Sequence, residues 1–348
     1  MRIEVDAVTV PTDAPESDGT LEWDSTTVLI VRIDEGIGYT YCHAAAAMLI
    51  RDTLADFVQD DVRSSWEAMN RAVRNMGRPG IASCAISAVD QALWDREARR
   101  LDVALIDLVG AAHDAVPIYG SGGFCSYTDD RLQEQLGDWA AAGIPRVKMK
   151  VGREPERDPA RLDAAREAIG DDVELFVDAN GAYGRKEALA WAERYALEWG
   201  VTWFEEPVSS ADEEGLRFLR DRAPAGMEIA AGEYAYVPAD FGHLVGAVDC
   251  LQADVTRCGG ISGLLGVSGL CDVFQLDLSA HCAPAISAHA FAAVPRLRHL
   301  EYFHDHVRIE RMLFDGVPEP EGGVLRPDRS RPGNGLELKV KEVQRWAS

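Results

Sequence analysis

The 348-residue sequence lacks any apolar run that approaches the length of about 18 residues that indicates a membrane-spanning helix. Its first residues are acidic and strand-like, without the basic and apolar segments of a signal peptide. The seven cysteines are odd in number and include no CxxC pair, which argues against disulfides and against zinc ligation by cysteine. These absences predict a cytoplasmic protein with reduced thiols.

Basic residues are scarce relative to acidic ones. The sequence contains 35 Lys and Arg against 58 Asp and Glu, which gives a formal net charge of -23. Such a chain is repelled by nucleic acid and by anionic membranes, so neither is an expected partner. A small-molecule carboxylate is still compatible with this charge, because a local cluster of lysines and a metal ion can attract an anion.

The first 115 residues are predicted to form an α+β domain. Two strand-like runs, at residues 3–10 and 26–33, flank a polar stretch at 11–19 that predicts a loop. Residues 81–101 give the clearest helical pattern, because apolar residues recur there at helical spacing.

From residue 116 the sequence pattern predicts strands and helices that alternate at intervals of roughly 20–30 residues. This alternation is typical of parallel βα units. No GxGxxG motif follows a first strand, which argues against a dinucleotide-binding fold. Eight strands fit a closed barrel, predicted over residues 116–318, better than an open sheet. The last residues, 319–348, are predicted to return to the first domain, with a strand at 336–343. The predicted barrel strands span residues 116–120, 146–150, 173–178, 201–205, 229–233, 250–254, 276–281 and 299–302.

Ionisable residues end nearly every predicted strand from the second to the eighth. In a parallel barrel of this kind, active-site groups lie at the carboxyl ends of the strands. A single polar strand end is unremarkable, because strand ends are wet, but seven in register indicate a site. These residues are Lys150, Asp178, Glu205, Glu233, Asp254, His281 and Glu301.

Three of these carboxylates, Asp178, Glu205 and Glu233, come from successive strands, so their oxygens can converge. Clustered carboxylates repel each other unless a cation lies between them. Ligands that are all oxygen suit a hard ion, with Mg²⁺ the first choice and Mn²⁺ the next. The alternative, three separately solvated acids, is disfavoured by the barrel.

Groups that can transfer protons lie beside this predicted metal site. Lys148 and Lys150 project from the same face of one strand, and a lysine beside another cation has a lowered pKa and can act as a base. Asp254 and His281 end neighbouring strands, so the carboxylate can orient the imidazole. A metal between a lysine and a histidine suits removal of a weakly acidic proton next to a carboxylate. Other histidines, including His43, His289, His304 and His306, are expected to be structural.

These residues resemble the motifs of the enolase superfamily and, within it, of the mandelate racemase branch, over nearly the whole chain. Lys148-Met149-Lys150 resembles the KxK motif, whose second lysine is the usual base. The three metal-ligand motifs have counterparts in Asp178-Ala179-Asn180, Glu205-Glu206-Pro207 and Gly232-Glu233. The remaining matches are Asp254 with His281 for the Asp-His dyad, Glu301 for the acid of the eighth strand, and Arg257 with Gly259-Gly260 for the turn after the sixth.

The resemblance implies an α/β fold: a (β/α)7β TIM-type barrel with an α+β N-terminal capping domain that the C-terminal segment completes. It implies Mg²⁺ or possible Mn²⁺, a small-molecule carboxylate substrate and a homo-oligomer. The catalytic residues it implies are Lys148, Lys150, Asp254, His281 and Glu301, with Asn180, Glu206 and Arg257 as supporting or substrate-binding residues. The sixth strand ends on Asp254 instead of a catalytic lysine, which argues for this branch and against the cycloisomerases and dipeptide epimerases of the muconate-lactonizing branch.

Within this branch many members are acid-sugar dehydratases, so the resemblance favours dehydration of an aldonate or aldarate to a 2-keto-3-deoxy acid. Specificity is expected in residues 11–23 and 42–47, and the acidic stretch 11–19 favours a monoacid. Two alternatives stay open. One is a racemase or epimerase of a 2-hydroxy acid, and the other is a non-catalytic metal-binding relative, which the retention of both bases disfavours.

Overall fold

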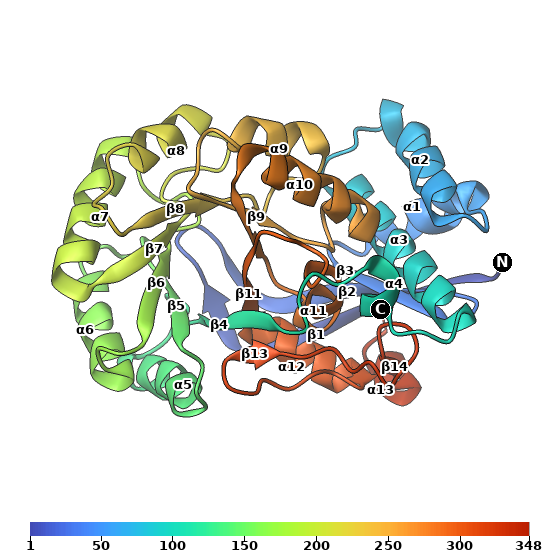
Figure 1. The fold of residues 1–348 in the computed structure, drawn as a ribbon. Helices are drawn as coiled ribbons and strands as arrows, with labels where there is room; N and C mark the ends of the chain where they lie inside the picture. The colour runs from blue at the N-terminus through green and yellow to red at the C-terminus, as the bar shows by residue number, and fades with distance from the viewer. Residues whose placement is uncertain (348) are drawn as a thin grey trace.

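The centre of the fold is a closed ring of parallel strands (Figure 1). The computed structural model describes residues 1–347. Strands β4 to β11 pair in chain order, and β11 pairs with β4 to close the ring. The predicted (β/α)7β barrel is therefore confirmed. Its strands are β4 (Val116–Gly122), β5 (Arg146–Lys150), β6 (Glu174–Asp178), β7 (Val201–Glu205), β8 (Glu228–Ala231), β9 (Cys250–Ala253), β10 (Asp277–Ala280) and β11 (Leu297–Phe303).

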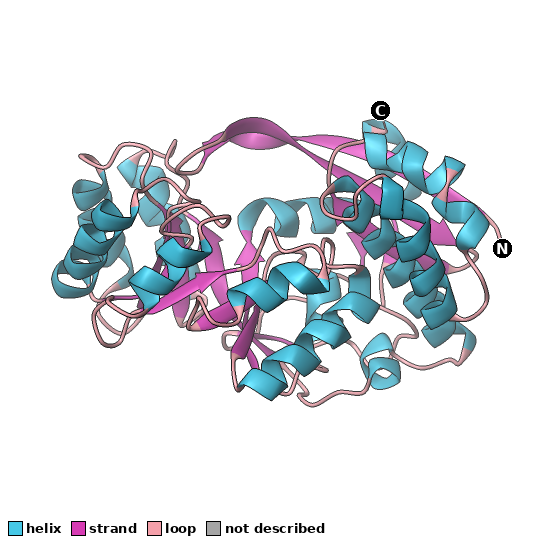
Figure 2. Cartoon of the chain, turned by 90° about the horizontal axis from the view of Figure 1, so that it is seen from above, coloured by secondary structure: helices cyan, strands magenta, loops and turns pink. Residues whose placement is uncertain are grey.

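Helices cover the outside of the ring, one after each strand, as the alternating pattern predicts (Figures 1 and 2). Local signals set several of their ends. The Thr128 side chain accepts a hydrogen bond from the Arg131 N–H at the start of α5, and Gly200 ends α7 in the left-handed conformation. The helices are α5 (Asp129–Ala141), α6 (Asp158–Ile169), α7 (Arg185–Trp199), α8 (Glu213–Arg220), α9 (Pro238–Leu244), α10 (Gly260–Phe274), α11 (Pro284–Phe291) and α12 (His304–Leu313).

An aromatic layer fills the barrel interior. Phe176 and Trp203 lie two residues before Asp178 and Glu205, so they point to the same inner face of their strands. Their rings stack with centroids 5.4 Å apart, and Tyr119 lies 5.4 Å from Phe176. All three are buried. This layer makes the barrel a packed core, so the carboxylates above it face only the carboxyl end of the strands.

The N-terminal domain begins with an antiparallel sheet of β1 (Ile3–Ser17), β2 (Glu22–Ile33) and β3 (Gly36–Tyr41). The prediction of a loop at residues 11–19 is wrong, because β1 continues to Ser17. The pairing register shifts between Pro11 and Glu16, and then Glu16 pairs with Trp23. The turn-forming residues thus mark an irregularity within one long hairpin, which arches away from the rest of the domain in Figure 2.

Two helices, α1 (Ala45–Asp52) and α3 (Ile81–Arg100), pack on this sheet, and α2 (Val62–Ala72) and α4 (Leu105–Val109) pack against α3. Short 3-10 turns lie at η1 (Leu54–Phe57) and η2 (Val73–Asn75). The longest, α3, lies directly against β3. A Cβ atom at Gly36 would lie 2.1 Å from the Ala92 carbonyl oxygen, and one at Gly38 would lie 2.2 Å from that of Ala88. Only glycine permits this close approach of helix and strand. The sheet and its helices confirm the α+β character predicted for the domain.

The C-terminal segment returns to the first domain, as predicted. It contains β12 (Phe314–Asp315), β13 (Val324–Leu325), β14 (Glu337–Leu338) and α13 (Val340–Trp346). The Asn334 side chain donates to the Ile37 carbonyl at 3.0 Å, and Ala347 bridges to Val8. The strand predicted at 336–343 is wrong beyond Leu338, because its partner β12 is only two residues long and the chain then turns into a helix. The domain boundaries at residues 115 and 318 stay predictions.

A buried carboxylate connects three of these segments. Asp95 of α3 accepts hydrogen bonds from the Ile37 N–H at 2.8 Å, the Asn334 N–H at 2.5 Å and the Arg99 guanidinium at 2.8 Å. Asp95→Ala leaves these donors unpaired, so we expect it to lower the free energy of unfolding by about 3–5 kcal/mol. Urea denaturation measures this loss. The control Glu193→Ala, at an exposed position of α7, should change it by less than about 0.5 kcal/mol. Equal values for the two variants would contradict the prediction.

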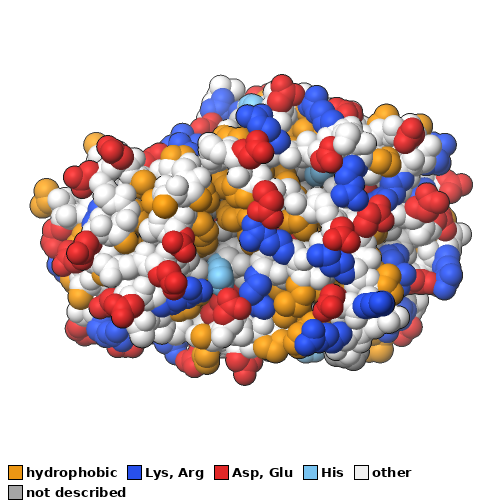
Figure 3. Space-filling view, turned by 90° about the horizontal axis from the view of Figure 1, so that it is seen from below, with side chains coloured by type: hydrophobic (Ala, Val, Ile, Leu, Met, Phe, Trp, Pro, Cys, Tyr) orange, Lys and Arg blue, Asp and Glu red, His pale blue; other side chains and the backbone are white. Residues whose placement is uncertain are grey.

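No helix within residues 1–347 is long and apolar enough to cross a membrane. On the side of the molecule shown in Figure 3, the excess of acidic residues does not form a uniformly negative surface. Figure 3 shows acidic and basic side chains interspersed on one side of the molecule, around a group of hydrophobic ones.

Candidate active site

The structure brings the predicted strand-end residues together at one end of the barrel. Lys150, Asp178 and Glu205 lie side by side in register across β5, β6 and β7. Glu233 lies just beyond β8, while Asp254 and His281 directly follow β9 and β10. All are at most 5% exposed. Parallel strands place their carboxyl ends at the same edge, which is why residues far apart in the sequence meet here.

Two buried lysines hold several of these carboxylates. Lys148 Nζ lies 2.5 Å from Glu205 Oε1, 2.8 Å from Glu301 Oε1 and 3.3 Å from Asp178 Oδ2. Lys150 Nζ lies 2.5 Å from Asp178 Oδ2. Burying a charged group is costly unless it is paired, and each of the two lysines has at least one carboxylate partner.

The expected lowering of the lysine pKa is not found in this arrangement. Burial lowers the pKa of Lys150, and so does the repulsion of Lys148, but the combined attraction of Asp178, Glu233 and Glu301 raises the pKa above its usual value. Burial likewise opposes a charge on Lys148, and Glu205 and Glu301 raise its pKa well above the usual value. The carboxylates that each lysine contacts outweigh the neighbouring cation, and residue spacing in the sequence does not reveal these contacts.

The predicted Asp-His pair is present. His281 Nδ1 lies 2.8 Å from Asp254 Oδ2, and Asp254 Oδ1 accepts hydrogen bonds from the Thr256 N–H and hydroxyl, each at 2.7 Å. The other imidazole nitrogen, Nε2, lies 2.7 Å from Glu233 Oε2. Burial disfavours the imidazolium, but the acidic groups of Cys282, Glu233 and Glu301 raise the pKa of His281 well above its usual value. The ring is therefore fixed in orientation and favours the protonated form.

The donor set of the site fits a hard divalent cation. Burial, together with the charge of Asp178, raises the pKa of Glu205 to about 8. Burial and the charge of Glu233 raise the pKa of Glu206 well above its usual value. Burial is the first cause of both shifts and repulsion between neighbouring carboxylates is the second, and an added cation would relieve this repulsion.

Two buried oxygen atoms beside the carboxylates lack a hydrogen-bond partner in the described residues: Glu206 Oε1 and Asn180 Oδ1. Both residues also adopt positive φ angles, 38° for Glu206 and 46° for Asn180. Buried oxygens without a hydrogen-bond partner and non-glycine residues in the left-handed backbone conformation are common at sites that bind a ligand or an ion. In the described arrangement, however, Asp178 and Glu205 face the lysines and Glu233 faces His281.

A cavity of about 410 Å³ opens onto this site. Predicted residues in its wall are Lys150, Asn180, Glu233, Arg257, His281 and Glu301. The others lie buried behind the wall: Lys148, Asp178, Glu205, Glu206 and Asp254. The structure thus separates groups that can touch a ligand directly from groups that lie one layer deeper.

The N-terminal domain completes the cavity. Asp18, Leu21 and Trp23 reach it from the hairpin, and Cys42 and His43 reach it from the segment after β3, so both stretches named as specificity regions contribute. Residues that sequence reasoning missed or considered structural also line the cavity: Tyr41, His43, Cys282, Phe303 and His306. Cys282 directly follows His281, and this adjacency was the signal that could have revealed it.

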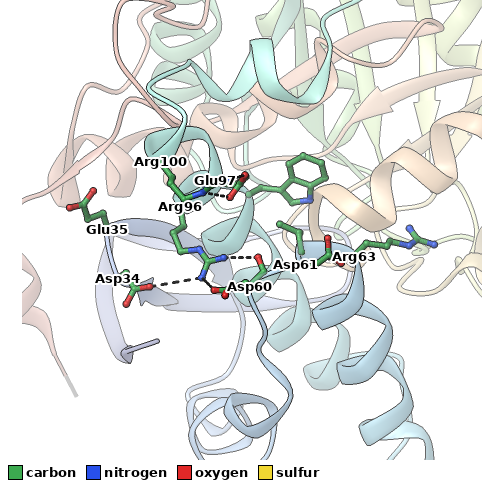
Figure 4. Close-up of a pocket in the computed structure, with 10 residues that line it drawn as sticks. Asp34, Glu35, Asp60, Asp61, Arg63, Arg96, Glu97 and Arg100 are labelled. Atoms are coloured by element: carbon green, nitrogen blue, oxygen red, sulfur yellow. Dashed lines mark hydrogen bonds and ion pairs between the residues drawn. The ribbon is translucent and has the colours of Figure 1, made fainter.

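Larger cavities exist, but they lack this chemistry. One of about 890 Å³ lies in the N-terminal domain, where Arg96 lies between Asp34 and Asp60 at 3.9 and 3.6 Å (Figure 4). Another, of about 920 Å³, includes residues at the amino ends of the strands, such as Arg146 and Glu174. Their charged groups pair with one another, as Arg146 does with Glu174 at 2.8 Å, so we assign the active site to the smaller cavity at the carboxyl ends.

Comparison with protein families gives two matches that together span most of the chain. A family model described as "Enolase C-terminal domain-like" matches residues 131–343. A second, described as "Mandelate racemase / muconate lactonizing enzyme, N-terminal domain", matches residues 3–110.

Individual proteins give consistent similarities. The chain is 31% identical over 365 residues to 3,6-anhydro-alpha-L-galactonate cycloisomerase of Streptomyces coelicolor, covering 99% of each. It is 34% identical over 323 residues to L-talarate/galactarate dehydratase of Salmonella typhimurium, covering 90% of this chain and 79% of that protein. A solved structure of this dehydratase with Mg and L-lyxarohydroxamate has a TM-score of 0.89 and 28% identity, covering 99% of this chain and 92% of that one. A mandelate racemase/muconate lactonizing enzyme-like protein from Rubrobacter xylanophilus has a TM-score of 0.98 and 59% identity, covering 100% and 99%.

Proposed function

The chain belongs to the mandelate racemase branch of the enolase superfamily, and from this premise we propose that it is a Mg²⁺-dependent lyase that dehydrates an acid sugar to a 2-keto-3-deoxy acid. The observation that carries the proposal is the placement of two proton-transferring groups in the wall of one cavity. Lys150 is the last residue of β5, and His281 directly follows β10. These two strands lie three positions apart around the closed ring of eight. A substrate between them meets a different group on each face.

Mg²⁺, when bound, would hold the substrate carboxylate and stabilise the negative charge that develops when the α-proton leaves. Asp178, Glu205 and Glu233 are the residues proposed to hold it. Lys148 keeps its charge among Glu205, Glu301 and Asp178, so it fixes these side chains and balances their charge. Lys150 is proposed to remove the α-proton, and His281 is proposed to protonate the departing 3-hydroxyl.

The remaining predicted residues have supporting roles. Asp254 orients His281 through the 2.8 Å contact with Nδ1. Arg257 lies 3.4 Å from Asp254 and donates to the Glu233 carbonyl at 3.0 Å, so it holds two neighbouring strand ends together. Asn180 and Glu301 line the cavity and can contact the hydroxyl groups of a sugar acid. The homo-oligomer that the resemblance implies stays a prediction.

The substrate class is proposed to include both aldonates and aldarates. The sequence favoured a monoacid, because the hairpin is acidic, but the structure weakens that argument. Asp18 accepts hydrogen bonds from the Thr20 and Leu21 N–H groups, each at 2.6 Å, so its charge already serves the turn. Burial and the charge of Asp305 raise the pKa of Glu16 to about 8, so at neutral pH this carboxyl is mostly uncharged. A dianion is therefore less disfavoured than the sequence suggests.

A screen of aldonic and aldaric acids tests the proposal. We expect at least one acid to give a 2-keto-3-deoxy product in the presence of Mg²⁺, detected by reaction of the ketone with semicarbazide. The matched control is Lys150→Ala, which lacks the proposed base and should give no product from the same acid. Absence of any such ketone across the library, with the protein shown to be folded, would count against dehydration.

The same screen distinguishes the alternatives. Asp254 at the end of the sixth strand argues against the cycloisomerases of the muconate-lactonizing branch. One relative, however, is a cycloisomerase of an anhydro sugar acid, so ring opening without loss of water is a second candidate. Such a reaction would remove the α-proton and expel the ring oxygen, so the product would keep the composition of the substrate, and its mass separates this reaction from dehydration. A racemase or epimerase gives exchange with inversion, and a non-catalytic relative gives no exchange.

A further inference from the structure

We propose that the active-site wall contains a second metal site, for a thiophilic divalent cation such as Zn²⁺, formed by His281, Cys282 and Glu301. This inference goes beyond the proposed function, since neither dehydration nor Mg²⁺ binding requires a thiol. Within residues 1–347, these residues form a buried group whose candidate ligand atoms all lie within 4.8 Å of one another. No CxxC pair marks the site in the sequence, because its three ligands come from two adjacent strand ends.

The distances match the edges of a tetrahedral site. Cys282 Sγ lies 3.3 Å from His281 Nε2 and 3.3 Å from Glu301 Oε2, and His281 Nε2 lies 3.5 Å from Glu301 Oε2. Zinc bound at the usual lengths, about 2.3 Å to sulfur and 2.0–2.2 Å to nitrogen and oxygen, requires ligand separations of about 3.4–3.6 Å. A shift of a few tenths of an ångström therefore converts the observed group into a zinc site, with the fourth position available to water or ligand.

The surrounding residues hold each ligand in a suitable state. Asp254 lies 2.8 Å from His281 Nδ1, which leaves Nε2 as the coordinating atom in a carboxylate–histidine–metal arrangement. Glu301 Oε1 is occupied by Ser121 at 2.6 Å and Lys148 at 2.8 Å, so Oε2 is the oxygen directed to the group. On binding, the proton of the Cys282 thiol and any proton on Nε2 are released to solvent, and the contact between Nε2 and Glu233 opens.

Sulfur separates this site from the Mg²⁺ site. A thiolate and an imidazole select Zn²⁺, Co²⁺ or Cd²⁺, whereas the carboxylates Asp178, Glu205 and Glu233 suit a hard ion. Occupancy would also remove the proposed acid, His281, from the reaction, because its Nε2 would carry the metal. The expected consequence is inhibition by thiophilic cations that excess Mg²⁺ does not relieve.

Binding of Co²⁺ tests the site without any substrate, so the result does not depend on the proposed function. With excess Mg²⁺ present, the purified protein should bind one Co²⁺ with a thiolate-to-cobalt charge-transfer band in the near ultraviolet, and Zn²⁺ should abolish the band. Cys282→Ser should lose the band and weaken Zn²⁺ binding on the order of 10²-fold or more, since loss of even an outer partner costs about 10–100-fold. Cys282→Ala serves as a second variant, and far-ultraviolet circular dichroism checks the fold of both.

The matched control is Cys42→Ser, because Cys42 is another cysteine in the same cavity wall. We expect it to keep both the band and the Zn²⁺ affinity. Two results would overturn the proposal: absence of a charge-transfer band in the unmodified protein, or an equal band and affinity in Cys282→Ser and the unmodified protein.

Discussion

Glu205→Gln is expected to abolish turnover while leaving the barrel folded. The substitution keeps the shape of the side chain and removes the carboxyl group that a bound cation would hold in its ionised form. Loss of a group that supports charge stabilisation in the transition state costs several kcal/mol, so we expect a decrease of at least about 10³-fold. Asp178→Asn and Glu233→Gln should behave alike, because the three carboxylates are proposed to act as one set.

The measurement has two parts: Mg²⁺ binding by titration calorimetry, and turnover of the acid found in the screen at saturating Mg²⁺. Glu205→Gln should lose both Mg²⁺ binding and turnover, and EDTA should abolish turnover by the unmodified protein. Far-ultraviolet circular dichroism should show an intact fold, since the apolar core around Val147, Val177 and Phe204 is separate from the site.

Glu310→Gln is the matched control for this prediction. Glu310 is also fully buried, and burial raises its pKa to about 8, but its hydrogen bonds go to Tyr39 and to the Ala285 N–H instead of to the lysines. Both hydrogen-bond partners of Glu310 lie outside the proposed Mg²⁺ ligand set, so Mg²⁺ binding should persist in Glu310→Gln. Retained activity in EDTA, or equal Mg²⁺ binding in Glu205→Gln and the unmodified protein, would refute the metal assignment.

The barrel could be predicted from the sequence because its signals are local and repeated. Each strand is a short buried run such as Val147 to Lys150, and each is followed by a helix, so the period alone identifies parallel units. The site followed from the same regularity, because register places Lys150, Asp178 and Glu205 at one level. Their catalytic and metal-binding roles stay predictions.

The parts that could not be predicted depend on contacts between distant segments. Glu16 belongs to a strand whose polar sequence predicts a loop. In the structure its Oε2 accepts a hydrogen bond from the Trp23 indole at 2.9 Å, so this polar residue stabilises a hairpin and is not part of a solvated turn. The lysine pKa values depended on which carboxylate each amine contacts, a matter of a few ångströms that spacing does not specify. The role of Cys282 required the distance from its sulfur to Glu301, a residue 19 positions away.

The roles of the two bases can be separated by isotope exchange. His281→Asn is expected to exchange the α-proton of the bound acid with solvent deuterium while failing to dehydrate it, and Lys150→Ala is expected to do neither. Hydroxide is a poor leaving group, so the group that protonates it must be a cation near neutral pH. The raised pKa of His281, which burial opposes and the acidic groups of Cys282, Glu233 and Glu301 produce, fits that role.

Lys150 fits the opposite role only after its contact with Asp178 is released. In the described structure this 2.5 Å ion pair keeps the amine protonated, and a cation held by Asp178 would remove the attraction and leave the repulsion of Lys148. Nuclear magnetic resonance in D₂O follows the exchange, and the ketone assay follows dehydration. Each variant needs intact circular dichroism before its activities are compared. Exchange lost in His281→Asn and kept in Lys150→Ala would assign the base to the histidine, and it would place proton removal on the opposite face of the α-carbon.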